Sequence, residues 1–561
     1  MSIATYIFVI LLLLILMGIL YYLRLYRHPL ILRLSNDTSQ LLIIPLEQLR
    51  QAKRLLQRTH RLKTVLADND VHITWLDSAI NFVNMSNYER TELIAEKLIA
   101  TCEKSTLNQA GSDVFKLCLG EAFPLNVSDC LLYFPPANLP AAAIIRRLQQ
   151  DDMYNRNVLI ISLKPTQQLR LRPYGEDRTT RLIVPTSREL TSLLLHPNPI
   201  EVFVFLLATQ LTTTQISPYV TKGGIAKDSA FFGRNKILTN ILNRQLGNYL
   251  IIGGRQLGKS SLLKRIERYY KNHPKIECYY LTLWDSDLRK TLISTLGLPK
   301  DTPLDDLLEK LGDVPVGKQR LFLIDESDEF IHSEKGNNYP VLGFFRSLSE
   351  LGNCHFILAG FWNLYDASCV DYRSPIKNFG QPIRLCELEA EACQQLATEP
   401  MAMLGIQYKS KDLVTQILTK TGQRANLVAT VCNEMLEKLT AEQRVLTKKD
   451  VTNALHSEAV AEALTGWGEL VADKTAARLD RIVIYATVTK GKFTKTSIIN
   501  FLNKHRYTFE VWQLEKSLKR LEIAFIIRRD NKKIYSYCVP LFREMLLKED
   551  LITLLKQELM S

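Results

Sequence analysis

The chain has 561 residues, 46% of them hydrophobic and 23% charged, with 24 Gly and 21 Pro. This composition is typical of globular proteins and excludes disordered, collagen-like and low-complexity classes. The length predicts about three or four domains. Lys and Arg (71) exceed Asp and Glu (58) by 13, which favours an anionic partner such as a lipid surface, nucleic acid or phosphate ligand.

The amino-terminal segment is the most hydrophobic part of the sequence. No charged side chain occurs in residues 1–23, and residues 7–20 are almost wholly aliphatic. Such a run can cross a bilayer, which needs about 20 apolar residues in a helix. A cleaved signal peptide would show a basic residue before the run and small residues after it, but Tyr21-Tyr22-Leu23-Arg24 follows. We therefore expect residues 1–27 to be an uncleaved transmembrane anchor.

Basic residues follow this segment and none precedes it. Arg24, Arg27 and Arg33 lie directly after the apolar run, so the positive-inside rule puts the rest of the chain in the cytoplasm. The expected localisation is the inner membrane, single-pass, with the amino terminus outside. The 10 cysteines show no CxxC or Cys/His ligand spacing, and we expect neither a structural disulfide nor zinc.

Residues 28–125 are expected to form a juxtamembrane helical region. From Leu46 to Leu66, leucines recur at helical spacing between basic residues. A basic amphipathic helix beside a membrane can rest on anionic lipid headgroups, and an ordinary solvated helix face explains the pattern equally well. The basic residues of this stretch are Arg50, Lys53, Arg54, Arg58, Arg61 and Lys63.

Residues 126–215 alternate between strand and helix patterns, which predicts a small α/β domain. The predicted elements are strands at 130–134, 158–162 and 181–184, a helix at 141–150 and a helix starting at Thr186. Acidic residues near the strand ends, Asp129, Asp151 and Asp152, could form a site, although turn and cap roles explain them more simply.

The phosphate-binding signature lies in residues 216–388, after a linker. An apolar strand at 248–252 is followed by a G-x-x-x-x-G-K-S loop and an amphipathic helix. Gly253 and Gly258 allow backbone angles that turn N–H groups toward phosphate oxygens. Lys259 is expected to reach the terminal phosphates, and the Ser260 hydroxyl to bind Mg²⁺. The predicted nucleotide contacts here are Gly253, Gly254, Arg255, Gln256, Leu257, Gly258, Lys259, Ser260 and Ser261.

A second motif completes this site. Asp325 and Glu326 follow the buried strand at 320–325. Asp325 is expected to help hold Mg²⁺, and Glu326 to act as general base on the attacking water. With strands at 276–282, 355–359 and 382–385, these form one parallel sheet with the site at its carboxyl edge. The fold class is therefore α/β, with a P-loop core of the additional-strand type.

From residue 216 to 561 the sequence resembles the STAND signalling ATPases and the related archaeal-type, AAA-like origin-recognition ATPases, in a membrane-anchored bacterial form. Phe231-Phe232-Gly233-Arg234 is similar to the family's aromatic-G-R-E box, with Asn235 replacing the Glu. The resemblance implies that Gly233 and Arg234 lie near the adenine. Asp325-Glu326-Ser327-Asp328 resembles the family's D-E-x-D motif, and residues 356–361 its sensor-1 strand, with Asn363 as candidate sensor.

The resemblance also covers the carboxyl-terminal half. Arg373 lies in a segment where the family carries a finger or sensor for the γ-phosphate; a surface ion pair is the alternative. Residues 389–470 resemble the helical lid, with Thr421–Asn426 replacing the usual G-x-P turn. Residues 471–561 resemble a winged helix, with helices at 478–489, 496–504 and 510–520 and strands at 523–528 and 533–537.

The sequence thus predicts a membrane-anchored, Mg²⁺-dependent ATPase that acts as a nucleotide-controlled signalling switch. Its expected partners are ATP, an anionic lipid surface, a protein and further copies of itself. The alternative is a DNA-binding AAA-like loader or transposition-type ATPase that uses the winged helix. A scaffold with a degenerate site is disfavoured because Lys259, Ser260, Asp325 and Glu326 are all present.

Overall fold

The computed structural model describes residues 12, 16–17, 22, 24–105, 113–120, 123–125, 127–151, 153, 155–177, 180–283, 287–440 and 443–560. These form two compact units, one comprising Met1–Ser217 with Met403–Gly405 and the other Pro218–Ala402 with Ile406–Ser561. The predicted membrane span lies almost entirely outside the described residues. Among the helices that are described, none is long and apolar enough to cross a bilayer.

The first unit contains a five-stranded mixed sheet in the order β1-β2-β3-β4-β5. Its strands are β1 (Ala100–Lys104), β2 (Asp113–Leu119), β3 (Asp129–Phe134), β4 (Val158–Ile160) and β5 (Leu182–Ile183). The first three pair antiparallel, and β3, β4 and β5 run parallel. The parallel strands are those predicted from their short apolar runs. Their buried side chains pack on α7 (Ala141–Gln150) in one hydrophobic core.

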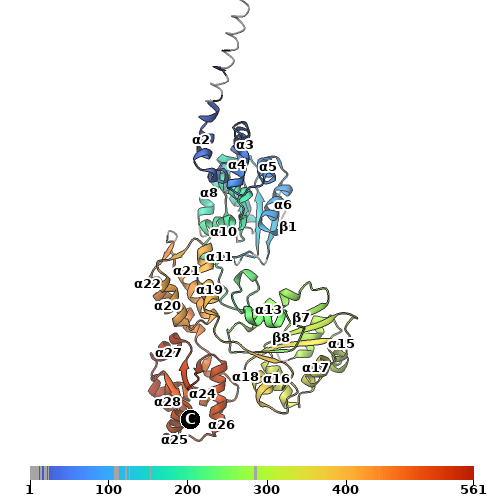
Figure 1. The fold of residues 1–561 in the computed structure, drawn as a ribbon, viewed down its shortest axis with the longest axis vertical. Coiled ribbons are helices and arrows are strands. Elements are labelled where there is room, and N and C mark those ends of the chain that lie inside the picture. The colour runs from blue at the N-terminus through green and yellow to red at the C-terminus, as the bar shows by residue number, and fades with distance from the viewer. Residues whose placement is uncertain are drawn as a thin grey trace, which may run out of the picture. The chain divides into compact units, whose positions relative to one another are not determined.

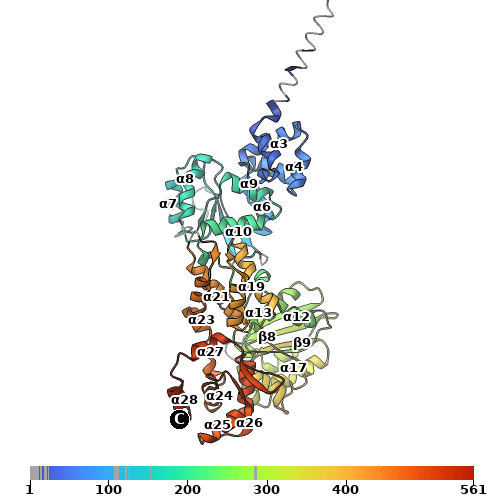
Figure 2. The same ribbon diagram turned by 60° about the vertical axis from the view of Figure 1, so that its left-hand side comes forward.

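The other helices of the first unit are, in chain order, α2 (Pro29–Asn36), α3 (Leu49–Arg58), α4 (Leu62–Asp68), α5 (Ile73–Asn81), α6 (Asn87–Leu98), α8 (Pro165–Glu176), α9 (Ser187–Leu195), α10 (Pro199–Gln210) and α11 (Thr213–Ile216). Of these, α6, α8 and α10 contact the strands, whereas α2 to α5 form a separate helical group beside α9 (Figures 1 and 2).

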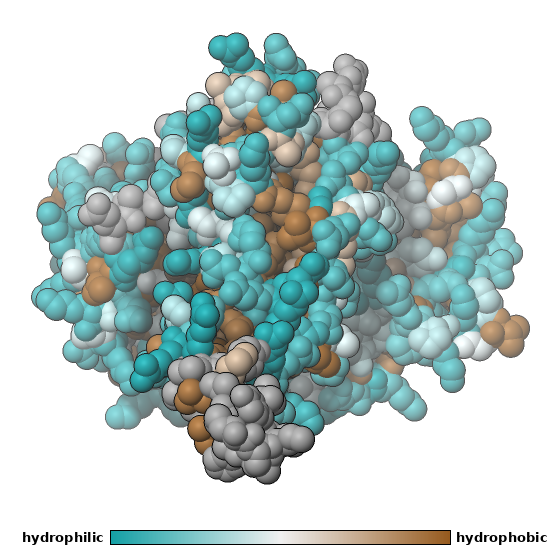
Figure 3. Space-filling view, turned by 90° about the horizontal axis from the view of Figure 1, so that it is seen from above, coloured by the Kyte–Doolittle hydropathy of each residue, from teal (hydrophilic) through white to brown (hydrophobic). Residues whose placement is uncertain are grey.

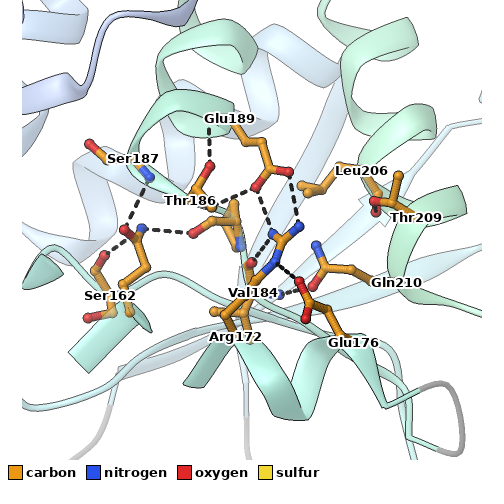
Figure 4. Close-up of polar contacts among 12 residues, drawn as sticks. Ser162, Arg172, Glu176, Val184, Thr186, Ser187, Glu189, Leu206, Thr209 and Gln210 are labelled. Carbon is orange, nitrogen blue, oxygen red and sulfur yellow. Dashed lines mark hydrogen bonds and ion pairs between the residues drawn. The ribbon is translucent and has the colours of Figure 1, made fainter. Parts of the chain in front are cut away.

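A polar network joins three of these helices to the end of β5 (Figure 4). The guanidinium of Arg172 on α8 donates to the Val184 carbonyl at 2.7 Å and to the carboxylates of Glu176 and Glu189. The Gln210 side-chain oxygen on α10 accepts the Val184 N–H at 2.8 Å. Because both backbone groups of Val184 lie beyond the sheet ladder, these side chains satisfy what would otherwise be costly buried polar atoms.

Two predictions for this unit need correction. The stretch from Leu46 to Leu66 is helical as predicted, but it is divided between α3 and α4, because α3 ends at Arg58 and His60 takes a left-handed φ of 54°. The region 28–125, predicted to be helical, also contains β1 and β2. These two strands pair with β3 and complete the sheet, although their own sequences show no clear period-two pattern.

The second unit is built on a five-stranded parallel sheet in the order β10-β6-β9-β8-β7. The strands are β6 (Tyr249–Ile252), β7 (Ile276–Thr282), β8 (Gln319–Asp325), β9 (Cys354–Gly360) and β10 (Gln381–Arg384). All five were predicted. Strand β9 lies between β6 and β8, so one strand separates the phosphate-loop strand from the strand that ends in Asp325. Parallel strands place both carboxyl ends at one edge.

Helices cover both faces of this sheet (Figures 1 and 2). They are α12 (Asn235–Leu242), α13 (Lys259–Tyr270), α14 (Leu288–Leu296), α15 (Leu304–Gly312), α16 (Asp328–Gly336), α17 (Pro340–Glu350) and the short α18 (Trp362–Tyr365), which continues into the π-helical turn η5 (Asp366–Val370). The apolar faces of α14 to α18 and the sheet share one hydrophobic core, which also takes in Ile523 from near the carboxyl terminus.

A helical subdomain, residues 390–463, follows the sheet. It consists of α19 (Ala390–Met403), α20 (Lys411–Thr421), α21 (Ala425–Lys438), α22 (Lys448–Leu455) and α23 (Glu458–Ala463), with the short parallel strands β11 (Gln407–Tyr408) and β12 (Val445–Leu446). The subdomain lies within residues 389–470, which resemble a helical lid in the sequence. Its first helix, α19, begins at Ala390 and contains Pro400.

The C-terminal subdomain, residues 474–546, has three helices and a three-stranded sheet in the order β13-β15-β14. Its elements are α24 (Lys474–Thr487), β13 (Lys492–Thr494), α25 (Lys495–Lys504), α26 (Val511–Ile523), β14 (Ile527–Arg529), β15 (Ile534–Tyr537) and α27 (Pro540–Leu546), and α28 (Leu551–Met560) follows. The strand predicted at 523–528 is shorter, because α26 extends to Ile523 and Phe525 adopts a left-handed φ of 59°.

Candidate nucleotide site

The loop between β6 and α13 has the geometry of a phosphate cradle. Gly258 adopts a φ of 90° and ends the loop as the N-cap of α13, a conformation that favours glycine. Lys259 and Ser260 then form the first turn of the helix, whose N-terminus carries partial positive charge. A turn that brings backbone N–H groups and a helix N-terminus together is suited to bind a phosphate.

The residues of the loop with a left-handed backbone differ partly from the prediction. Gly253 was expected to have a positive φ and does not have one. Gln256 has a φ of 61° instead. Gly253 is needed for space, because a Cβ there would lie 3.2 Å from Cβ of Leu385. Leu257 is buried and anchors the loop, while Arg255 is exposed.

The Lys259 ammonium lies folded over the loop and is buried. It donates to the carbonyl oxygens of Gly253 and Gly254 at 3.0 and 3.1 Å. These hydrogen bonds provide partners for the charged group and hold it at the phosphate loop. There the ammonium can exchange the carbonyl oxygens for phosphate oxygens.

Asp325 and Glu326 lie at the carboxyl end of β8, as predicted. Asp325 is 2% exposed, and its carboxylate accepts the N–H of Glu326 at 3.0 Å and the hydroxyl of Tyr280 at 2.8 Å. Glu326 is exposed and has a left-handed φ of 54°, a strained conformation for a non-glycine residue. Its side chain is therefore available to a reacting water, while Asp325 is fixed below it in the sheet.

The carboxylate of Asp328, two residues after Glu326, binds the N-terminus of α18, the short helix that follows β9. It accepts the backbone N–H groups of Phe361, Asn363 (2.7 Å) and Leu364 (3.3 Å). The Asn363 amide also donates to the Asp328 carbonyl at 3.2 Å. Burial raises the pKa of Asp328, and the three N–H donors supply the compensation that a buried carboxylate needs. The predicted sensor Asn363 is thus locked to the helix that follows Glu326.

Other predicted nucleotide contacts have structural roles in this arrangement. The Arg234 guanidinium donates to the carbonyls of Glu387, Cys386 and Leu257, so it braces the phosphate loop. Burial lowers its pKa. Gly233 has a φ of 70° and packs against α19, where a Cβ would lie 2.7 Å from Ala392.

Ser261 and Arg373 also point away from the phosphate cradle. The Ser261 hydroxyl accepts the Ile225 N–H at 3.1 Å, in the segment that precedes the core. The Arg373 side chain is 90% exposed, and its guanidinium lies 4.0 Å from the Asp371 carboxylate. Its finger role stays a prediction.

Two residues of the helical subdomain contact the phosphate loop, and sequence analysis did not assign them to the site. Arg424 donates to the Arg255 carbonyl at 2.8 Å, and Asn426 donates to the Gln256 side chain at 3.0 Å. Burial lowers the pKa of Arg424 to about 10, and its Nε has no hydrogen-bond partner among the described residues. In the sequence, the only sign of this half-buried cation is an Arg in the Thr421–Asn426 turn.

The C-terminal subdomain also contacts the loop. The Gly254 N–H donates to the Ile523 carbonyl at 3.0 Å. A Cβ on Gly254 would lie 2.9 Å from Cα of Ala524 and 3.0 Å from its carbonyl oxygen. The motif tolerates any residue at this position, so the close approach of α26 gives a specific reason for glycine here.

The donors at this edge suit Mg²⁺ bound together with a nucleotide. The protein offers the Asp325 carboxylate and the Ser260 hydroxyl, and Mg²⁺ prefers such oxygen ligands while retaining waters and substrate phosphates. Among the described residues, no three His, Cys, Asp or Glu side chains gather into a metal-binding group. A site completed by phosphates and water fits this short donor set.

The chain was compared with known proteins. No protein-family model matches the sequence, and no curated protein matches it significantly. Among solved structures, it is similar to the Walker-type ATPase PABY2304 of Pyrococcus abyssi, with 16% identity and a TM-score of 0.45 over 58% of this chain and 98% of that one.

Two further solved structures resemble parts of the chain. The ORC2 protein of Aeropyrum pernix has 15% identity and a TM-score of 0.40 over 58% of this chain and 93% of that one. The RuvB Holliday junction branch migration motor of Thermotoga maritima has 13% identity and a TM-score of 0.29 over 55% and 92%. At these values the likenesses establish no family and no activity. The P-loop fold therefore rests on the sheet order and the loop geometry described above.

We expect Gly254→Ala to loosen the contact between the phosphate loop and α26. The added Cβ meets backbone atoms of Ala524, and overpacking of this kind costs about 1–3 kcal/mol. Hydrogen exchange in α26 and β14 should become roughly tenfold faster or more. Gly343→Ala is the control, because a Cβ on this helical glycine meets nothing within 4 Å. Unchanged exchange in α26 would show that the contact does not hold the two subdomains together.

Proposed function

We propose that this protein binds and hydrolyses ATP and acts as a nucleotide-dependent switch anchored in a membrane. The observation that carries the proposal is that one phosphate loop contacts two subdomains at once. Arg424 of the helical subdomain holds the Arg255 carbonyl, and Ile523 of the C-terminal subdomain holds the Gly254 N–H. A nucleotide that changes the loop therefore changes groups that both subdomains bind.

The proposed hydrolysis uses residues at the carboxyl edge of the sheet. Lys259 binds the terminal phosphates, and Ser260 and Asp325 hold Mg²⁺, which when bound neutralises part of the phosphate charge. Glu326 accepts a proton from water as the water oxygen bonds to the γ-phosphorus. The bond to the bridging oxygen breaks, its electron pair leaves with ADP, and phosphate is released.

The switch proposal is supported by a second contact between α26 and the core. The Arg520 guanidinium lies 4.8 Å from the Trp362 ring centroid, and Lys516 pairs with Asp366 at 3.4 Å. Trp362 is the first residue of α18, the helix whose N-terminal N–H groups bind Asp328. Hydrolysis at Glu326, two residues before Asp328, would thus take place beside a helix that contacts α26.

We infer that residues 474–546 form a winged helix that relays the nucleotide state. The order of its helices and its hairpin supports this reading. Its α26, the third helix, turns Lys516 and Arg520 toward the core, and Arg520 also forms a buried pair with Asp480 at 2.7 Å. Basic side chains engaged in this way are not free for DNA phosphates, which favours a relay over sequence reading by α26.

DNA binding remains the second candidate because of the hairpin after α26. Its four basic residues are exposed, namely Arg528, Arg529, Lys532 and Lys533. If the hairpin binds DNA, the full-length chain should shift duplex DNA, and the affinity should fall steeply with salt. Alanine at Arg529 and Lys532 should reduce the shift. Absence of any shift at low salt would leave the relay as the role of this subdomain.

ATP turnover by the full-length chain tests the enzymatic proposal. Glu326→Gln should retain nucleotide binding and lower turnover by about 10²–10⁴-fold, because general-base catalysis is lost. Lys259→Ala should weaken binding itself, whereas Lys264→Ala, one turn along the same helix, should behave like wild type. Arg373→Ala should lower turnover if this residue is a finger, in cis or from another copy. The proposal fails if the wild-type chain neither binds nor hydrolyses ATP.

The membrane proposal rests on residues 1–27 and on the basic surface that follows. On α3, Arg50, Arg54 and Arg58 are exposed on one face while Leu49 and Leu56 are buried. The face seen in Figure 3 is mainly hydrophilic, with hydrophobic residues in small groups. Exposed Arg and Lys next to a bilayer attract anionic lipid by about 1 kcal/mol each.

We expect the full-length protein to stay in the membrane fraction after alkaline and high-salt washing. A variant lacking residues 1–23 should be released by high salt, because only electrostatic attraction to lipid would remain. Replacing Arg50, Arg54 and Arg58 with Ala in that variant should further weaken its binding to phosphatidylserine vesicles. Release of the full-length protein by alkaline washing would contradict the anchor.

A further inference from the structure

A tyrosine on the edge strand of the second unit contacts the carboxylate that is proposed to hold Mg²⁺. Tyr280 lies on β7, and its hydroxyl donates to Oδ2 of Asp325 at 2.8 Å. In the β7–β8 ladder Thr282 lies opposite Asp325, so Tyr280, two residues earlier, projects from the same face of the sheet. The contact is built into the strand register.

The two oxygens of Asp325 are held by different donors. Oδ2 accepts the Tyr280 hydroxyl and Oδ1 accepts the Glu326 N–H at 3.0 Å. A carboxylate oxygen has two lone pairs, so each oxygen keeps one for a cation or for a water bound to it. One donor on each oxygen fixes the rotation of the carboxylate, and each oxygen still has a lone pair with which to bind a ligand.

We propose that Tyr280 is a positioning residue for the metal-binding carboxylate of Asp325. It touches no reacting atom itself, and it acts through the orientation of the carboxylate that it holds. The inference rests on the proposed ATPase function, since it concerns the same site. Donors of this kind behind a metal ligand typically change metal affinity by about 10–100-fold when they are removed.

The environment of Tyr280 keeps its hydroxyl a donor. Burial, together with the neighbouring Asp325 charge, raises the pKa of Tyr280, so the phenol retains its proton throughout the physiological range. The bond also has a charged acceptor, and such hydrogen bonds are about twice as strong as neutral ones. A phenylalanine at this position would keep the ring and remove only the donor.

The preceding residue provides a matched control. Tyr279 projects from the opposite face of β7, where its ring stacks on Phe322 with centroids 5.3 Å apart. Its hydroxyl lies 3.5 Å from the Glu277 carboxylate, which Lys318 and Arg320 also hold at 3.0 and 3.1 Å. Tyr279→Phe therefore makes the same chemical change on the same strand without touching the site.

The experiment uses the full-length chain and separates metal binding from nucleotide binding. Affinity for a fluorescent non-hydrolysable ATP analogue is measured in EDTA, and binding of Mn²⁺ to the analogue complex is then followed by electron paramagnetic resonance. Tyr280→Phe should weaken Mn²⁺ binding by about 10–100-fold and leave nucleotide affinity in EDTA unchanged. Tyr279→Phe should match wild type in both measurements, and thermal unfolding should show that both variants fold.

The outcomes distinguish this inference from the proposed function. If wild type binds the analogue and Tyr280→Phe binds Mn²⁺ as tightly as wild type, the positioning role is overturned while the ATPase proposal stands. Equal losses of nucleotide affinity in EDTA and of Mn²⁺ affinity would reveal a structural role and also overturn it. If wild type binds no nucleotide, both proposals fall together.

Discussion

The buried carboxylate of Asp328 is the interaction on which the arrangement of the site depends. It lies two residues after Glu326 and accepts three N–H groups at the start of α18, the helix that follows β9. Burial opposes its charge, and the nearby Lys259 ammonium favours it. The N–H donors at the start of α18 and the phosphate-loop lysine both favour the charged form. The Asp328 carboxylate thus links the strand end that carries Glu326 to the phosphate loop and to α18.

The helix α18, whose N-terminus Asp328 binds, and the turn η5 that follows it contact α26. Trp362 lies under the Arg520 guanidinium. The Asp366 carboxylate forms ion pairs with Lys516 of α26 and with Lys335 of α16. One turn after Arg520, the last residue of the same helix, Ile523, accepts the Gly254 N–H of the phosphate loop. Because both contacts are made by one helix, a shift of α26 would alter both. The C-terminal subdomain is thereby linked to both halves of the nucleotide site.

Sequence patterns predicted the sheet of the second unit and its two motifs, because each strand is a short apolar run and each motif follows a strand end. The contacts that complete the site could not be predicted in this way. Arg424 and Ile523 lie more than 160 residues from the loop they touch, and only tertiary packing brings them together. Gly253 was misread for a related reason: its neighbour Leu385 restricts the space for a Cβ, whereas the motif alone suggests a backbone angle.

The distribution of basic residues changes the meaning of the net charge of +13. A basic third helix in a winged-helix pattern suggests nucleic acid, yet Arg520 is paired with Asp480 and Lys516 with Asp366. These charges are compensated inside the unit and contribute little to the field that an external polyanion meets. Exposed basic residues lie on the hairpin after α26 and on one face of α3. These two surfaces are therefore better candidates for an anionic partner than α26.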